Sequence, residues 1–365
     1  MRVAWFCGGY PPDRTGGVPS IMKQLVEGLR AKGHEVTVIT PRFERRIREN
    51  GLVQFELPLP HLHENIHYGL WCLKVLHYFW KNRGKFDVHC GHMVWGFLAC
   101  LLGNGKWVVV PHVATMVYQG WLESFAHKLN YWITRAAYRK ADRIIAISDF
   151  MKQDLETNFP FTQGKVQRVY YGVDTDFFKP VPVRKDPGKK RLLYLARLRP
   201  EKGVEAVIKA FRLLEARGLA NGLELVIAGG CSAAYLEYLQ RTYPEARFLG
   251  SLSREQTREQ YSQASLYLIP SVGESFCLSL VEAMGCELPV LCSDLPIFRE
   301  ITQGKAFFVP PANPEKLTER MVEVVQRSDL EARGKQMREI ALNYQVENNV
   351  TGYERVLREL AGETK

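Results

Sequence analysis

The sequence predicts an α/β protein with two doubly wound parallel-sheet domains, and three observations support this fold class. At 365 residues the chain exceeds what one hydrophobic core usually serves. Short β-branched and aromatic runs alternate with helical patterns, and strands that are apolar throughout are typical of parallel sheets buried on both faces. Three prolines and a charge run interrupt this alternation at 174–191. We therefore expect Rossmann-like domains at 1–178 and 190–345, facing each other across a cleft that holds the ligand.

The strands are expected to follow one another at regular intervals in both halves of the chain. In the first half they are predicted at 2–7, 35–40, 52–58, 86–90, 107–113, 143–148 and 166–172. In the second half they are predicted at 191–197, 223–230, 246–250, 266–271, 288–293 and 306–311.

A final helix is predicted within 346–365 and is expected to pack back toward the N-terminal domain. Val350, Tyr353, Leu357 and Leu360 form an apolar stripe at helical spacing. Asn349 precedes this stripe and is the predicted N-cap.

Composition restricts the class of protein. The chain is 46% hydrophobic and 24% charged, as in ordinary globular proteins, and its longest apolar stretch, 93–103, is too short to span a bilayer. The N-terminus lacks the pattern of a signal peptide. Eight cysteines occur without a CxxC pair and are expected to be reduced. These features predict a cytoplasmic protein, with peripheral attachment to the inner face of the membrane left open.

The net charge of +10 is concentrated in the first half of the chain. Residues 1–180 carry 23 Lys and Arg against 15 Asp and Glu, so an anionic partner is expected for this half. Nucleic acid is not predicted, because no RNP-type, zinc-finger or basic-region motif is present. The aromatic and basic segment 66–85 is typical of a helix that rests on an anionic membrane and presents a lipid-linked acceptor. The alternative is a helix that only docks on the first sheet.

Histidines at 61–67 and 89–92 suggest a zinc site, because imidazole and thiolate are common zinc ligands. No second cysteine pair completes such a site, so these residues are expected to be loop and strand-end residues and no metal is predicted.

A glycine-rich loop follows the first predicted strand. Gly16 and Gly17 precede a helix with Pro19 in its first turn and no acidic residue there, so the positive end of the helix is available to a phosphate. The loop matches neither GxGxxG nor GxxxxGK[ST], which argues against a dehydrogenase and a P-loop enzyme. The alternative is that these glycines only form a turn.

Two cations follow the first strand of the second half. Arg197 ends that strand and Lys202 begins the next helix, where its charge opposes the helix dipole. This placement becomes favourable if both side chains bind a diphosphate. The alternative is a pair of solvated surface cations.

Two acidic residues follow the strand at 266–271. Glu274 is predicted in the loop and Glu282 about one turn into the next helix, and each carboxylate could accept hydrogen bonds from sugar or ribose hydroxyls. The alternative is a capping acid and an exposed helix acid.

Taken in order, these segments resemble the retaining glycosyltransferases of family 4, which have the GT-B fold. The resemblance covers nearly the whole chain. The segments that carry it are GGVPSIMKQLVEGLRAKGHEVTVIT, ADRIIAISDFMKQDL, YYGVDTDFFKP, LLYLARLRPEKGVEAVIKAF, LELVIAGG and RFLGSLSREQTREQYSQASLYLIPSVGESFCLSLVEAMGCELPVLCS.

The resemblance implies a role for each candidate residue. The backbone of Gly16 and Gly17 would approach the donor diphosphate, and Arg197 with Lys202 would neutralise it as it leaves. Glu282 would bind the ribose hydroxyls. Glu274 and the backbone of the residues after it would hold the transferred sugar; these are Ser275, Phe276, Cys277 and Leu278. His112, at the end of the strand predicted at 107–113, would lie near the sugar and the acceptor, and its alternative is a satisfied strand-end histidine.

The implied reaction is retaining transfer of a hexose-type sugar from a nucleotide diphosphosugar, with UDP-sugars favoured over GDP- and ADP-sugars. The acceptor would be a hydroxyl of a glycan, a lipid-linked molecule or a small molecule. No cofactor and no metal are implied, because Arg197 and Lys202 take the place of a metal. A phosphorylase or epimerase of the same architecture, and a nucleotide-sugar-binding scaffold without activity, remain alternatives.

Three positions depart from the pattern of the family. Cys277 stands where glycine is frequent, and its side chain could narrow the pocket for the sugar. Glu287 replaces a small residue, and Tyr171 replaces a common asparagine. Neither Glu287 nor Tyr171 is expected to affect the proposed contacts of Arg197 and Lys202 with the diphosphate.

Overall fold

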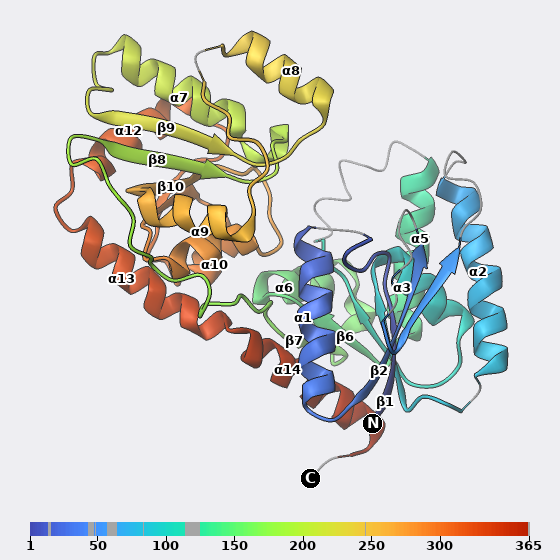
Figure 1. Cartoon of the computed structure of the whole chain (residues 1–365). Coiled ribbons are helices and arrows are strands. Elements are labelled where there is room, and N and C mark those ends of the chain that lie inside the picture. The colour runs from blue at the N-terminus through green and yellow to red at the C-terminus, as the bar shows by residue number, and fades with distance from the viewer. Residues whose placement is uncertain are drawn as a thin grey trace. The chain divides into compact units, whose positions relative to one another are not determined.

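The chain forms two compact units. The computed structural model describes residues 1–13, 16–42, 47, 49–56, 64–82, 84–113, 125–244 and 246–363 (Figure 1). One unit comprises Met1–Gly172 with Val346–Lys365, and the other comprises Val173–Gln345. Within the described residues each unit contains one sheet, and every strand pair in both sheets is parallel. The predicted fold class of two doubly wound α/β domains is therefore confirmed.

The sheet of the first unit has the strand order β3-β2-β1-β4-β5-β6-β7. Its strands are β1 (Arg2–Phe6), β2 (Glu35–Arg42), β3 (Leu52–Glu56), β4 (Val88–His92), β5 (Trp107–Val110), β6 (Arg143–Ala146) and β7 (Val166–Arg168). The chain leaves β1 on one side to form β2 and returns on its other side as β4, so the strand order reverses at β1. In open α/β sheets ligands bind beyond the carboxyl ends of the strands at such a reversal.

The helices of the first unit form two groups by their contacts. Helices α1 (Gly17–Ala31) and α14 (Val346–Ala361) pack against each other, and α14 also contacts β4. Helix α3 (Met93–Leu102) lies between α2 (Glu64–Lys81) and α5 (Phe125–Lys140) and contacts both (Figure 1). Helix α6 (Asp149–Asn158) and the 3₁₀ turn η1 (Pro160–Thr162) connect β6 to β7.

Helix α14 begins earlier than the sequence predicted. Its first residue is Val346, so Asn349 lies inside the helix and its prediction as the N-cap is wrong. The Asn349 side chain is buried and donates a hydrogen bond to the backbone carbonyl of Tyr170. A buried amide needs such a partner, and this contact ties α14 to the segment after β7.

The sheet of the second unit has the order β12-β11-β10-β8-β9. Its strands are β8 (Lys190–Leu195), β9 (Leu223–Ala228), β10 (Leu266–Ile269), β11 (Val290–Ser293) and β12 (Phe307–Val309). All four residues of β10 and all four of β11 are buried, as expected for central strands of a parallel sheet covered on both faces.

The strand predicted at 246–250 does not form. Phe248 makes a single bridge to Ile227 of β9, and the chain then turns at Gly250, whose φ is +69°. The carbonyl of Gly250 accepts a hydrogen bond from Gly229 beyond the end of β9. The backbone of Arg247 and Leu249 also hydrogen-bonds Ile227, so the segment pairs with the edge strand β9 at a single bridge and does not continue as a regular strand.

The helices of the second unit surround its sheet. Helix α7 (Val204–Ala216) packs on α12 (Pro314–Val325), and α10 (Leu278–Gly285) contacts both α9 (Arg254–Gln263) and α13 (Leu330–Ala341). The remaining elements are the 3₁₀ turns η2 (Pro200–Lys202) and η3 (Leu342–Tyr344) and the helices α8 (Ala233–Thr242) and α11 (Pro296–Ile301).

Candidate functional site

The N-terminus of α1 in the first unit has no side-chain cap from the described residues. Gly17 is the first residue of α1, and Gly16 before it has a φ of +125°, which favours glycine. Among the described residues no side chain caps this end, and an added Cβ at Gly16 would meet nothing within 4 Å. The open end can therefore accept an anion, which is what the predicted contact of Gly16 and Gly17 with a diphosphate requires.

His112 lies in a chain of buried polar side chains within the first unit. Its Nε2 is 3.1 Å from Nδ1 of His92, and Nε2 of His92 is 3.2 Å from the Sγ of Cys90. The Nδ1 of His112 hydrogen-bonds the hydroxyl of Tyr171. Trp5 stacks on His92 with ring centroids 4.5 Å apart. We call Cys90, His92, His112 and Tyr171 the histidine chain.

The histidine chain is uncharged at neutral pH. Burial lowers the pKa of His112 to about 3 and holds the pKa of His92 well below its usual value. Burial also raises the pKa of Tyr171 and of Cys90. A neutral imidazole has one N–H donor and one acceptor nitrogen, so the hydrogen bonds must all run in one direction, toward Cys90 or toward Tyr171. Both ring nitrogens of His112 are used in this arrangement.

Sequence reasoning did not foresee these contacts. Tyr171 was noted only as a departure from the family pattern, and His92 and Cys90 only as possible zinc ligands. Cys90 and His92 are two residues apart in β4 and therefore project from the same face of the strand, which is the one signal available in the sequence. A ligand contact through the His112 ring remains a prediction, and it would require one of these two hydrogen bonds to open.

Tyr171→Phe is expected to lower the free energy of unfolding by about 1 to 3 kcal/mol, because it leaves the buried Nδ1 of His112 without its partner. The measurement is urea unfolding at neutral pH. Tyr170→Phe is the matched control: its hydroxyl makes an exposed 3.2 Å hydrogen bond to Asp149, so a change within about 0.5 kcal/mol is expected. Equal effects of the two variants would contradict the histidine chain.

Arg197 and Lys202 occupy the segment that follows β8 in the second unit. The strand ends at Leu195, so Arg197 lies two residues beyond it and not at its end. Lys202 lies in η2, before α7 begins at Val204, and not in the helix as predicted. The Arg197 side chain is exposed, and none of the described residues forms a hydrogen bond or ion pair with it. Arg197 is therefore available to an anionic ligand.

Lys202 and Glu274 form an ion pair that the sequence did not predict. The distance from Lys202 Nζ to Glu274 Oε1 is 2.6 Å, and the same oxygen accepts a 3.0 Å hydrogen bond from the buried hydroxyl of Ser271. Glu274 follows β10 and Lys202 follows β8, which are paired strands, so the ion pair lies at the carboxyl edge of the sheet. The structure thus places a cation and an acid of the candidate site in direct contact.

Gly203 allows this contact. Its φ of +76° is in the left-handed region, and an added Cβ would lie 2.4 Å from the carbonyl oxygen of Pro270. The close approach holds η2 against the end of β10, where Val272 also donates a 3.0 Å backbone hydrogen bond to Glu201. The tyrosine hydroxyl of Tyr194 on β8 fixes the turn further by donating to the carbonyl of Lys202.

Gly203→Ala is expected to cost about 2 kcal/mol more stability than Gly218→Ala, because a β-carbon at position 203 overpacks the Pro270 carbonyl. Gly218 has a similar φ of +70° and nothing within 4 Å of an added Cβ, so it controls for backbone strain alone. Thermal and urea unfolding of both variants would measure the difference. Similar losses at the two positions would show that close packing at Gly203 does not hold the Lys202 turn.

The backbone at the start of α10 is strained at Cys277. This residue has a φ of 74° and a ψ of 82°, a left-handed conformation that favours glycine, and no side chain among the described residues caps the helix that begins at Leu278. Burial raises the pKa of the Cys277 thiol to about 12, so the thiol stays protonated. Phe276 is buried beside Tyr344, with ring centroids 5.8 Å apart. Ser275 and Leu278 complete the loop and the first turn.

Glu282 lies one turn into α10, as predicted. Its Oε2 accepts a 3.2 Å hydrogen bond from the hydroxyl of Tyr261 on α9. Burial raises the pKa of Glu282 to about 7, while the Tyr261 hydrogen bond and the charge of Arg254 oppose this shift. In the described residues no hydrogen bond joins Glu282 to Glu274. The two acids therefore have different environments, since Glu274 is paired with a cation and Glu282 with a neutral hydroxyl.

The candidate zinc ligands do not converge in the described part of the chain. His89 stacks on Trp107 at 4.8 Å, while Cys90 and His92 belong to the histidine chain. His61 and His63 lie outside the described residues. Among those described, no group of three or more His, Cys, Asp and Glu residues could hold a metal ion.

The aromatic segment 66–85 largely coincides with α2. Trp71, Val75 and Tyr78 are buried, so one side of the helix packs against the unit. Packing of this helix was one of the two alternatives for the segment. Leu73, Leu76 and Trp80 on the same helix are exposed. None of the helices in the described part of the chain combines the length and the apolar character that crossing a bilayer requires.

Comparison with known families identifies the chain. Residues 15–177 match the model of Glycosyltransferase Family 4, and residues 176–342 match the model of Glycosyl transferases group 1. The chain belongs to the family 4 glycosyltransferases. The predicted family is confirmed, and together the two matches span nearly the whole of both units. The protein is therefore a glycosyltransferase enzyme.

Relatives and solved structures agree with this assignment. An uncharacterized glycosyltransferase of Methanocaldococcus jannaschii is 28% identical over 349 residues, with 87% of each chain covered. The phosphatidyl-myo-inositol mannosyltransferase of Mycobacterium tuberculosis is 27% identical over 87% of this chain and 84% of its own. The GDP-mannose-dependent alpha-mannosyltransferase of Mycolicibacterium smegmatis is 29% identical over 80% of both chains. Sucrose-phosphate synthase from Thermosynechococcus elongatus has a TM-score of 0.84 at 18% identity, with both chains fully covered, and shares the GT-B fold.

Proposed function

We propose that this glycosyltransferase moves a hexose residue from a nucleotide diphosphosugar to a hydroxyl of a glycan or lipid-linked acceptor, with retention of the anomeric configuration. The observation that carries the proposal is the Lys202–Glu274 ion pair at the carboxyl edge of the second sheet. A cation that can meet the leaving diphosphate there contacts an acid that can bind sugar hydroxyls. Arg197, exposed on the same loop and without a described partner, supplies a second cation.

In the proposed reaction the bond between the anomeric carbon and the diphosphate oxygen breaks. The acceptor oxygen bonds that carbon from the same face, and the acceptor proton passes to a phosphate oxygen of the leaving group. The main task of the protein is to stabilise the charge on the diphosphate, which Arg197 and Lys202 would do without a metal ion. Glu274 is a binding group in this scheme and not a nucleophile, because Lys202 and Ser271 already engage its carboxylate.

The remaining site residues have binding roles in the proposal. The open N-terminus of α1 at Gly16 and Gly17 would meet the diphosphate, and Glu282 would accept hydrogen bonds from the ribose hydroxyls. The backbone from Ser275 to Leu278 would face the transferred sugar, where the side chain of Cys277 reduces the space that glycine would leave.

We favour a UDP-sugar as the donor, and a relative that is named GDP-mannose-dependent makes a GDP-sugar the first alternative. A lipid acceptor is supported by the relative named for phosphatidyl-myo-inositol. Such an acceptor would be met by a peripherally attached protein at the inner face of the membrane.

The test is a mass-spectrometric screen of UDP-, GDP- and ADP-sugars against glycan and lipid acceptors, scored by release of the nucleoside diphosphate together with a glycosylated product. NMR of the product reports the anomeric configuration, and an unchanged rate with a chelator supports metal independence. Phosphate-dependent release of free sugar without acceptor product would identify a phosphorylase, and binding without turnover would identify a scaffold. Either outcome would refute the proposal.

A further inference from the structure

The exposed large hydrophobic side chains of the first unit are confined to three neighbouring helices. In the described part of this unit, all of them lie on α2, α3 or α5: Leu73, Leu76, Trp80, Met93, Leu129 and Trp132. Helix α3 contacts the other two, so these residues belong to one layer of the unit. Scattered surface hydrophobics need no explanation, but their confinement to one layer indicates an interaction surface.

Helix α2 is apolar on two sides. Trp71, Val75 and Tyr78 face the interior of the unit. Leu73, Leu76 and Trp80 follow one another at intervals of three and four residues, and Leu73 and Trp80 are 65% and 66% exposed. A helix on the surface of a globular protein normally carries polar residues on its outer stripe. An outer stripe of Leu and Trp is typical of helices that lie in a membrane interface.

The same three helices are strongly basic. They contain six cationic residues and a single acidic residue, Glu64. The cations are Lys74, Lys81, Lys128, Arg135, Arg139 and Lys140. This charge complements an anionic surface, and each cation near an anionic membrane contributes on the order of 1 kcal/mol to binding.

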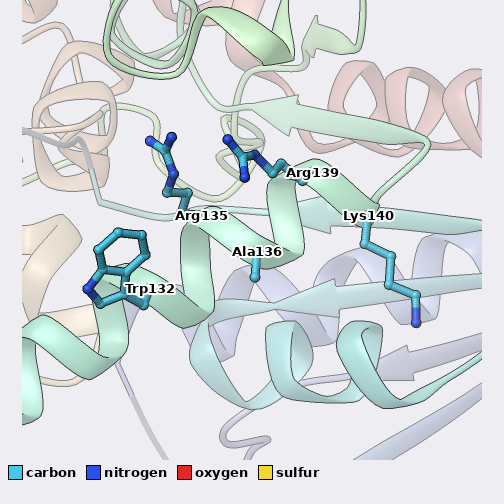
Figure 2. Close-up of a pocket in the computed structure, with 5 residues that line it drawn as sticks. All are labelled: Trp132, Arg135, Ala136, Arg139 and Lys140. Atoms are coloured by element: carbon cyan, nitrogen blue, oxygen red, sulfur yellow. The ribbon is translucent and has the colours of Figure 1, made fainter.

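Three of these cations line a hollow of about 380 Å³ on α5. Its lining residues are Trp132, Arg135, Ala136, Arg139 and Lys140 (Figure 2). Figure 2 shows the side chains of Arg135 and Arg139 extending toward the same side of the helix, with Trp132 beside Arg135. Trp132 is 62% exposed, Arg139 is exposed and Arg135 is partly exposed, so all three side chains are accessible to a ligand.

The cationic side chains of this hollow differ in the contacts that they make. Lys140 donates hydrogen bonds of 2.8 and 2.6 Å to the carbonyls of Leu101 and Gly103 at the end of α3. Arg135 and Arg139 instead stack over the ring of Phe161, at 5.3 and 4.9 Å from its centroid. Among the described residues neither arginine pairs with a carboxylate. Stacking orders the two guanidinium groups and leaves their N–H donors to an external anion.

We infer that α2, α3 and α5 form a docking face for an anionic phospholipid bilayer, in which Arg135 and Arg139 bind lipid phosphates and Leu73, Leu76, Trp80 and Trp132 enter the interface. Guanidinium groups bind phosphate oxygens in pairs, and tryptophan favours the headgroup level of membranes. Nucleic acid would use the cations but would leave the outer leucines of α2 in water. The inference extends the expected contact of residues 66–85 to α5 and does not depend on the proposed donor or reaction.

Flotation of the full-length protein with vesicles tests the inference. Vesicles of phosphatidylcholine alone are compared with vesicles that also contain phosphatidylglycerol, at low and at physiological salt. The wild-type protein is expected to bind the anionic vesicles and to lose affinity as salt rises. Arg135→Gln with Arg139→Gln is expected to weaken this binding about 30-fold. Trp80→Ala with Trp132→Ala should weaken it as well, since the apolar contacts are lost.

The matched control is Arg217→Gln with Arg241→Gln, which removes two exposed arginines of the second unit and should leave vesicle binding unchanged. Thermal unfolding checks that all variants are folded. Absence of binding to both kinds of vesicle, or equal binding to both, would overturn the inference. So would an Arg135/Arg139 variant that binds like the control. Inorganic phosphate at constant ionic strength forms the last arm: stabilisation of the wild-type protein by phosphate without vesicle binding would show a site for free phosphate instead.

Discussion

Replacing both Arg197 and Lys202 with alanine is expected to abolish sugar transfer and the thermal stabilisation that a nucleoside diphosphate gives to the wild-type protein. Each cation is proposed to stabilise the leaving diphosphate, and loss of one preorganised charge contact costs about 100-fold to 1000-fold in rate. Loss of both should place the activity below detection. The measurements are product formation by mass spectrometry and the shift in unfolding temperature on addition of the diphosphate, which is worth about 2.7 kcal/mol at 100 times the dissociation constant.

Two exposed cations on the same loop and helix provide the control for this variant. Within the described residues Arg199 forms an ion pair with Glu201 and Lys209 with Glu205, so Arg199→Ala with Lys209→Ala should leave transfer and nucleotide stabilisation nearly unchanged. If Arg197→Ala with Lys202→Ala retained both properties, the proposed diphosphate site would be wrong even if the protein proved to be a transferase.

The Lys202–Glu274 ion pair adds a further expectation for the single variants. Lys202→Ala removes the cation beside a shielded carboxylate, so it should destabilise the protein more than Lys202→Ala combined with Glu274→Gln. The measurement compares the unfolding midpoints of the single and the double variant. A lower midpoint for Lys202→Ala alone would show that part of its effect on activity comes from the unpaired carboxylate of Glu274.

The second large effect is expected at Glu282, where stability and binding should change in opposite directions. Its pKa is raised from 4.5 in the unfolded chain to about 7 in the folded protein by burial. Between these values the folded protein binds more protons, so stability falls as pH rises through this window. Above pH 7 the buried charge costs on the order of 3 kcal/mol. Glu282→Gln is therefore expected to stabilise the protein at pH 8 and to change little at pH 4.5.

The same substitution is expected to weaken nucleotide binding about 10-fold to 100-fold, because a charged acceptor of two ribose hydroxyl hydrogen bonds becomes a neutral amide. In the wild-type protein nucleotide affinity should rise with pH through about 7, as Glu282 ionises, and this dependence should vanish in the variant. Urea unfolding and calorimetric titration at several pH values measure the two effects. Glu259→Gln, at an exposed position of α9, is the control for loss of one acidic residue.

The two outcomes at Glu282 are separable. Unchanged nucleotide affinity would refute the ribose contact, while stabilisation at pH 8 would still confirm that the carboxylate is buried at a cost. Absence of that stabilisation would show instead that Glu282 is solvated in the free protein.

The sequence predicted those features that depend on local pattern. Apolar strands separated by helices identified both parallel sheets, and the positions of Glu274 after β10 and Glu282 inside α10 follow from the strand and helix boundaries. Residues 246–250 have the composition of a strand because Phe248 and Leu249 are apolar, yet they pair with the edge strand β9 at a single bridge only among the described residues. Asn349 has the chemistry of an N-cap, but its partner, Tyr170, lies 179 positions away.

Contacts between distant segments account for what could not be predicted at the candidate site. The histidine chain joins β4, the second residue after β5 and the segment after β7, and no local pattern connects His112 with Tyr171. The approach of Lys202 to Glu274 depends on the left-handed Gly203 and on the pairing of β8 with β10. Cys277 was recognised as a departure from the family. Its left-handed backbone conformation, however, can be seen only in the structure.

The return of α14 to the first unit has a consequence for the order of folding during synthesis. Val350 on this helix fills the space above Gly28, and Tyr353 lies 5.9 Å from the ring of Trp5, so the core of the first unit is incomplete without the last residues of the chain. The whole of Val173–Gln345 must be translated before these residues emerge, a delay of roughly 10 to 35 seconds at ordinary elongation rates. Most of the second unit can therefore begin to fold while the unit whose synthesis started first still lacks α14.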